Sequence, residues 1–105
     1  HFHPHLTITV DGLEETIPAN IGITRDCMAA VHTHDAIGTI HIESAFGDKQ
    51  FYLKDFFTVY GQPIERDGYS VSMKVDGKEL SERGDLLLKD KQEILLEYKK
   101  LDTSF

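Results

Sequence analysis

LKDFFTVYG, residues 53–61, is the stretch of sequence that decides the fold class. Its apolar residues stand at positions i, i+3, i+4 and i+7, and they are Leu53, Phe56, Phe57 and Tyr60. This spacing gives a helix a single apolar stripe. Gly61 favours a left-handed cap, and Pro63 prevents the helix from continuing. We therefore predict one amphipathic helix over residues 53–60.

Alternation of apolar and polar residues predicts strands on both sides of this helix. Before it, residues 6–10 alternate, and Asp11-Gly12 marks a turn. A second extended run over residues 16–23 completes a predicted β-hairpin. After the helix, residues 69–75 and 93–98 alternate in the same way and predict two more strands.

The segment that joins the hairpin to the helix is ambiguous. Thr24 could cap a single helical turn that carries Cys27, Met28 and Val31 inward. Two further extended segments then follow, over residues 31–35 and 39–43.

This order of elements predicts an α+β fold in which one amphipathic helix covers one face of a mixed sheet. The layout is β-grasp-like. A chain of 105 residues is of a size that buries enough apolar surface to fold alone, so we expect a single domain over residues 1–105.

The histidines are the most informative residues for function. All six fall in clusters spaced by two residues, namely His1, His3 and His5, then His32 and His34, then His41 with Glu43. Residues two apart in a strand point to the same face, so each group presents its imidazoles together. A connection at Gly38 would also bring His32 or His34 across from His41. If Ile40 and Ile42 point to the core, the histidines occupy the face that the helix does not cover, or its rims.

Imidazole and carboxylate groups are ligands of zinc, copper, nickel and non-haem iron. We therefore predict a metal site, whose candidate ligands are His1, His3, His5, His32, His34 and His41, with Asp35, Glu43 and Cys27 as secondary candidates.

The secondary candidates each have alternative roles. Asp35 could bind the metal, orient an imidazole, or only form a turn before Ala36. Glu43 could be solvated or support a ligand. Cys27 and Met28 could offer soft sulfur to copper(I), or could pack in the core.

Copper is the expected metal, because intrinsic affinity for nitrogen-rich sites peaks at this ion, and zinc is the alternative. Calcium and magnesium are excluded as preferred ions because they take oxygen ligands. The formal net charge of -7 argues against nucleic acid as a partner and suits a protein that attracts cations. No apolar stretch approaches the roughly 18 residues of a membrane span.

Two resemblances add expectations. The hairpin, the string LKDFFTVYG and the ending VSMKVDGKEL to LLLKDKQEILLEY resemble the small sulfur-carrier β-grasp proteins. Those carriers act through a C-terminal Gly-Gly tail, which this chain lacks, so the resemblance implies the fold alone. The strings HPHLTITVDG, IPANIGI and HTHDAIGTIHIES resemble a family of small archaeal and bacterial extracytoplasmic proteins. That resemblance implies a shared histidine-rich site and a periplasmic or cell-surface location behind a removed leader or an N-terminal anchor.

Three functions fit these features. The first is an extracytoplasmic protein that carries, buffers or senses copper or zinc, working with a metal-handling protein partner or as a metal-bridged homodimer. The second is a β-grasp interaction module that senses pH through its histidines and needs no metal. The third is a small metal-dependent oxidoreductase, which would need an open coordination position. The sequence contains no Gly-x-Ser-x-Gly nucleophile motif and no phosphate-binding glycine loop.

Overall fold

The computed structural model describes residues 2–25, 28–43 and 49–102. The elements, in chain order, are β1 (His5–Val10), β2 (Leu13–Glu15), β3 (Val31–His32), β4 (His41–Ile42), α1 (Leu53–Tyr60), β5 (Tyr69–Val75), β6 (Lys78–Leu80), the 3-10 helix η1 (Arg83–Asp85) and β7 (Glu93–Lys100). None of the helices that this part of the chain forms has the length and apolar composition needed to cross a lipid bilayer.

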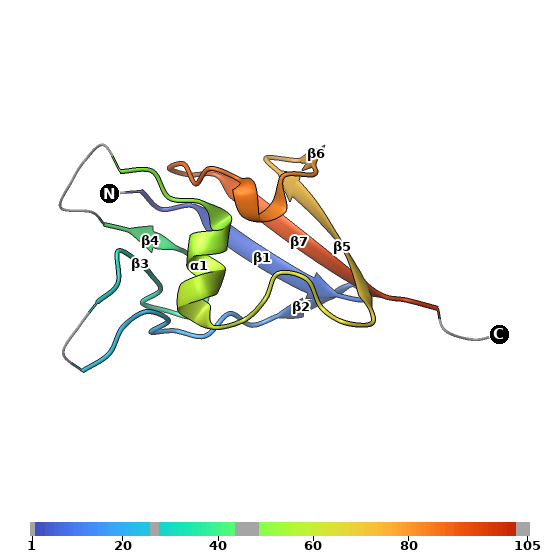
Figure 1. The fold of residues 1–105 in the computed structure, drawn as a ribbon, viewed down its shortest axis with the longest axis horizontal. Helices are drawn as coiled ribbons and strands as arrows, with labels where there is room; N and C mark the ends of the chain where they lie inside the picture. Colours follow the sequence, from blue (N-terminus) through green and yellow to red (C-terminus); the bar gives the residue numbers. More distant parts are fainter. Residues whose placement is uncertain (1, 26–27, 44–48, 103–105) are drawn as a thin grey trace.

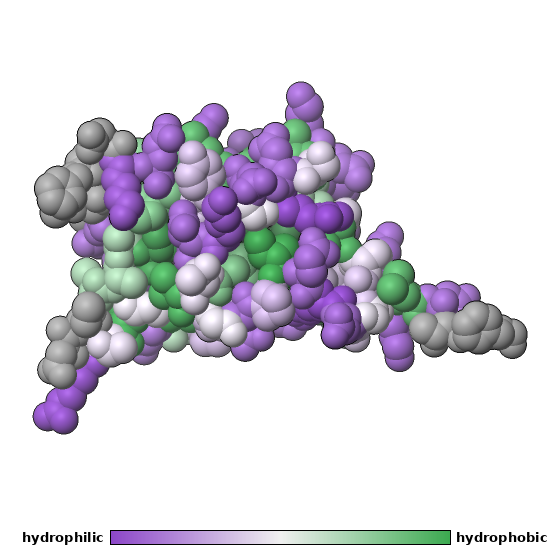
Figure 2. Space-filling model, in the orientation of Figure 1, coloured by the Kyte–Doolittle hydropathy of each residue, from purple (hydrophilic) through white to green (hydrophobic). Residues whose placement is uncertain are grey.

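The largest feature is a five-stranded sheet in the order β2-β1-β7-β5-β6. The central pair, β1 and β7, is parallel, and the other pairs are antiparallel. Helix α1 packs on one face of this mixed sheet (Figure 1). The predicted α+β class and its β-grasp-like layout are therefore confirmed. Hydrophilic side chains cover much of the face shown in Figure 2, with apolar residues visible between them.

Helix α1 begins and ends where the sequence predicts. The backbone N–H of Tyr52 donates to the Asp55 carboxylate (2.7 Å), which satisfies a donor at the start of the helix. Gly61 ends the helix in the left-handed conformation, with φ of 79°, and its N–H bonds the carbonyls of Phe57 and Thr58. The apolar stripe is buried, with Phe56 and Leu53 fully inaccessible to solvent.

The alternation of the three long strands predicts correctly which side chains enter the core. One parity of each strand faces α1, and the buried side chains are Leu6 and Ile8 of β1, Val71, Met73 and Val75 of β5, and Ile94, Leu96 and Tyr98 of β7. The opposite parity carries half-exposed or exposed residues.

The short strands β3 and β4 form a separate two-stranded sheet that lies beside the N-terminal half of β1 (Figure 1). Residues 38–42 run antiparallel to residues 2–6. The N–H of Ile40 donates to the Pro4 carbonyl (2.8 Å), and the N–H of Ile42 donates to the Phe2 carbonyl (3.0 Å). The chain therefore extends the sheet at one end of β1, while β2 pairs with the other end.

The prediction of an extended strand over residues 16–23 is wrong. The hairpin at Asp11-Gly12 forms, but its second strand is β2, over Leu13–Glu15. Ile17 and Ile21 are buried, so their alternation reports burial and not pairing with β1. The extended run is interrupted because Asn20 and Gly22 both adopt positive φ.

The helical turn predicted from Thr24 is not formed by the residues that the structure describes there. Val31 is buried as expected, whereas Met28 is 47% exposed and pairs with Ile23 in an isolated bridge. Met28 is therefore not a core residue. Cys27, which was predicted on the same turn, lies outside the described residues.

One ion pair connects β2 to the loop after α1. Arg66 donates two hydrogen bonds to the Glu15 carboxylate (2.9 and 2.6 Å). The guanidinium also lies 4.3 Å from the centre of the Tyr98 ring, which is a favourable cation–π distance. The hydrogen bond and charge of Arg66 hold the pKa of Glu15 below its usual value.

Replacing Glu15 with glutamine should lower the free energy of unfolding by about 1 kcal/mol at pH 7, the order expected for a bidentate pair that is partly buried. Because the folded-state pKa of Glu15 is lowered, its contribution is present above the unfolded value of about 4.3 and is lost as pH falls through the folded value. Urea unfolding of the native protein and the variant at pH 7, 5 and 3 measures this. Glu14→Gln, at the exposed neighbouring position, is the control, and an equal difference at all three pH values would contradict the prediction.

Candidate metal centre

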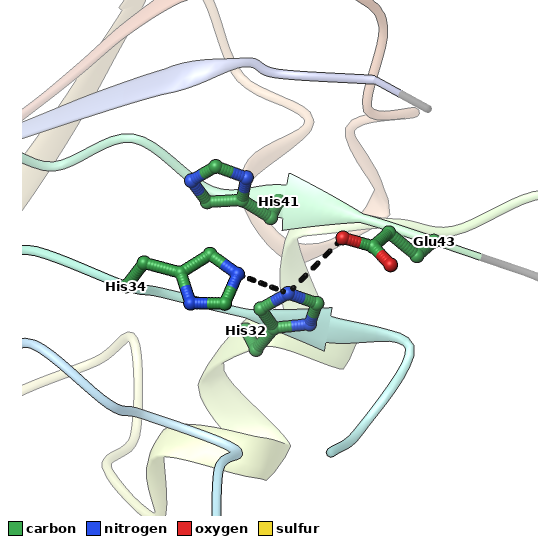
Figure 3. A group of neighbouring side chains, drawn as sticks. All are labelled: His32, His34, His41 and Glu43. Carbon is green, nitrogen blue, oxygen red and sulfur yellow. Dashed lines mark hydrogen bonds and ion pairs between the residues drawn. The ribbon is translucent and has the colours of Figure 1, made fainter.

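Two antiparallel strands place four potential metal ligands side by side. His32 on β3 is directly opposite His41 on β4. His34 lies two residues beyond His32, and Glu43 lies two residues beyond His41, so all four belong to the same parity. One ligand atom from each side chain lies within 4.8 Å of the others. Figure 3 shows the three imidazoles and the carboxylate converging from the two strands.

His32 is the hub of this cluster. Its Nε2 lies 3.2 Å from His34 Nε2 and 3.6 Å from Glu43 Oε1. In a tetrahedral zinc site, with metal–nitrogen distances near 2.0–2.1 Å, two donors are about 3.3 Å apart. The two distances from His32 Nε2 are therefore close to those between donors that bind the same metal ion. All four donor atoms lie within 4.8 Å of one another.

The ring of His32 is held in the tautomer that metal binding requires. Its Nδ1 lies 2.7 Å from the Ala29 carbonyl, which can only accept, so Nδ1 carries the proton. In the neutral ring, Nε2 then presents its lone pair toward His34 and Glu43. A backbone carbonyl that fixes a histidine in this way is a common support for a metal ligand. The side chain of His32 is 0% exposed, so the base of the cluster is shielded from water.

Buried residues that alternate with the histidines determine which way the imidazoles point. Ile40 and Ile42 are buried on either side of His41, which turns the imidazole to the opposite face. Thr33 does the same between His32 and His34. Its hydroxyl donates to the Pro18 carbonyl (2.9 Å) and accepts from the N–H of Ile21 (3.0 Å).

The crowded imidazoles favour a neutral ring at His41. His41 stacks nearly parallel to His32, with ring centres 5.6 Å apart, and meets His34 edge-on at 4.5 Å. Partial burial, and next the charges that His34, His3 and His32 would carry, lower the pKa of His41, against a smaller opposite effect of Asp35. Ligating histidine must be neutral, so these surroundings favour metal binding over protonation.

His3 borders the cluster without belonging to it. The bridges formed by Phe2 with Ile42 and by His5 with Thr39 place His3 opposite His41, and the two ring centres are 4.9 Å apart. The backbone N–H of His3 donates to Asp90 Oδ1 (2.9 Å), and the ring Nδ1 lies 3.9 Å from the same oxygen. His32, His41 and His3 thus form a row across three neighbouring segments.

His5, predicted as a ligand, has both ring nitrogens engaged elsewhere. Nδ1 bonds the Glu93 carboxylate (2.9 Å), and Nε2 bonds the Ile37 carbonyl (2.5 Å). The loop packs closely against β1 here, because a Cβ on Gly38 would collide with the Leu6 carbonyl oxygen. His5 therefore connects β1 and β7 to the loop between His34 and His41.

The remaining candidates have different outcomes. Asp35 is exposed, and its Oδ1 accepts from the N–H of Ile37 (3.4 Å), which matches the predicted turn role. Glu43, a secondary candidate, is a member of the cluster. His1 and Cys27 lie outside the described residues.

Three supporting groups could not be found from the sequence. The Ala29 carbonyl is a backbone group, and nothing in the residue type marks it. The position of Thr33 between His32 and His34 shows only that its side chain points to the opposite face, and does not reveal its hydrogen bonds. Asp90 is far from His3 in sequence and approaches it because β1 and β7 are parallel neighbours.

Stability measurements on metal-free protein, kept in chelator, should reveal the lowered pKa of His41. Below the unfolded value of about 6.5 the unfolded chain binds more protons at this position than the folded chain does. The stabilisation is therefore complete above pH 6.5 and is lost as pH falls toward the lowered folded value. Denaturant unfolding from pH 8 to pH 5 should show a shallower loss in His41→Gln than in the native protein. Parallel curves would contradict this assignment.

Comparison of the chain with protein-family models, with curated proteins and with solved structures gave no match. The site is therefore interpreted from its own chemistry. Three imidazoles and one carboxylate, gathered on a buried hub, form a cluster that could hold a metal ion.

Proposed function

We propose that this protein binds copper outside the cytoplasm and carries, buffers or senses the ion, with zinc as the alternative metal. The observation that carries the proposal is the convergence of His32, His34, His41 and Glu43, whose ligand atoms lie within 4.8 Å of one another. The proposed location rests on the resemblance of the histidine strings to extracytoplasmic proteins. The formal charge of -7 supports attraction of cations to the surface.

The donor chemistry favours a transition metal. Three neutral imidazoles and one carboxylate are borderline donors, which suit copper(II), zinc and nickel. Calcium and magnesium prefer sites made of oxygen ligands, so they would bind this set weakly. Affinity for such a set is highest for copper(II). The exposed position of His34 suits a protein that exchanges its metal, because an exposed ligand can leave and return without unfolding the strands.

Titration of tag-free protein with copper(II) and zinc(II) is the direct test. We expect one copper(II) per chain, bound more tightly than about 1 μM near pH 7, and weaker zinc. Replacing His32 and His34 with alanine should abolish binding. Because His32 is buried, the variant His34→Gln/His41→Gln provides a second test at more exposed positions. Affinity should decrease below about pH 6 as the histidines take up protons.

The matched control is His5→Gln, which removes an imidazole outside the cluster and should retain copper, provided that its thermal melt shows a folded protein. Elemental analysis of the purified protein then identifies the metal it acquires in the cell. Binding weaker than about 1 μM for both ions, or equal loss in the His5 control, would overturn the proposal.

A pH-responsive interaction module is the second candidate, and the lowered pKa of His41 favours it. The three imidazoles of the cluster cannot all be charged without repulsion, so acidification would disturb the β3–β4 sheet. Binding to a protein partner that survives chelators and is lost on acidification would support this function over metal handling.

A further inference from the structure

The exposure of the four ligand side chains changes across the cluster. All four come from the same face of two adjacent strands. His32, at the base, is 0% exposed, and the Glu43 side chain is 33% exposed. His34 is exposed and His41 is half-buried, so exposure increases from the base of the cluster toward its rim. An ion held by these donors keeps its opposite side toward solvent.

The charge of such a centre is unbalanced. A divalent ion with three neutral imidazoles and one carboxylate has a net charge of about +1. Among the described residues, the buried base offers no further anion, because the remaining polar contact of His32 is the neutral Ala29 carbonyl. A positive charge that faces solvent attracts a small anion.

Among the described residues beside the cluster, Asp35 is the carboxylate that could compete for this position. It follows His34 directly and acts electrostatically on His41. However, its Oδ1 accepts from the N–H of Ile37 (3.4 Å), and the side chain is exposed in the turn. Among the described residues, the cluster that could hold an ion contains only the three histidines and Glu43.

We infer that the bound metal has a solvent-facing coordination position that takes one small anionic ligand with a nitrogen or oxygen donor. This inference rests on the proposed copper site. The ligand binds by replacing water on the ion, with no change in oxidation state and no covalent change in the protein. Exchange of such ligands makes the site an open centre, unlike a closed structural one.

Azide is a suitable probe, because its coordination to copper(II) gives a charge-transfer absorption band. The copper-loaded protein should show a saturable band with one azide per copper, together with a changed electron paramagnetic resonance spectrum. Acetate should displace the azide competitively. Copper retained after desalting, measured by elemental analysis, ensures that the signal comes from the protein and not from copper released into solution.

Asp35→Asn separates an open position from one filled by the chain. Equal azide affinity in the native protein and in this variant supports the inference. Azide binding in the variant alone would overturn it, because Asp35 would then occupy the position. A non-saturable signal, or release of copper by azide, would also overturn it. Failure to bind copper at all would instead refute the proposed function, so the two failures are distinct.

Discussion

The antiparallel pairing of residues 38–42 with residues 2–6 is the constraint on which the rest of the site depends. Backbone hydrogen bonds from Ile40 to Pro4 and from Ile42 to Phe2 fix its register. A shift of one residue would turn every side chain of this segment to the other face, so that His41 would enter the core and Ile40 would leave it. Burial of Ile40 and Ile42 opposes such a shift. Burial of these two side chains in the core thereby directs His41 toward the other ligands.

The same pairing joins the five-stranded sheet to the two-stranded β3–β4 sheet. The β-grasp-like sheet and α1 hold the apolar core, and the β3–β4 sheet carries the imidazoles at the end of β1. His5 connects these parts by bonding Glu93 on β7 and the Ile37 carbonyl in the loop. His5 therefore stabilises the fold and lies outside the metal-ligand cluster. His5 has the same spacing in the sequence as His3, but both of its ring nitrogens bond groups outside the cluster.

The cluster combines a shielded base with an accessible rim. His32 is buried and held in one tautomer by the Ala29 carbonyl, whereas His34 is exposed. Preordering of the base lowers the entropic cost of binding an ion. Exposure of the rim permits exchange of the ion or of a small ligand on it. Under the proposed function, these two properties suit an exchangeable metal centre better than a closed structural site.

Much of the fold followed from periodicity, because burial on one face leaves a visible alternation or stripe. Helix α1, the parity of β1, β5 and β7 and the α+β class were predicted correctly. The strand over residues 16–23 was not, since Ile17 and Ile21 are buried without pairing with β1. Periodicity reports which side chains are buried and is silent on which strand lies alongside.

The same-face grouping of the histidines could be predicted from the sequence, because side chains two residues apart in an extended chain point the same way whichever strand lies beside them. Which of these groups meet depends on the tertiary fold. It brought His32, His34, His41 and Glu43 together, left His3 at the edge beside Asp90, and engaged His5 elsewhere. The physical reason is that a metal site needs donors a few ångströms apart. Such proximity across strands is set by register and sheet order, which are properties of the packed core.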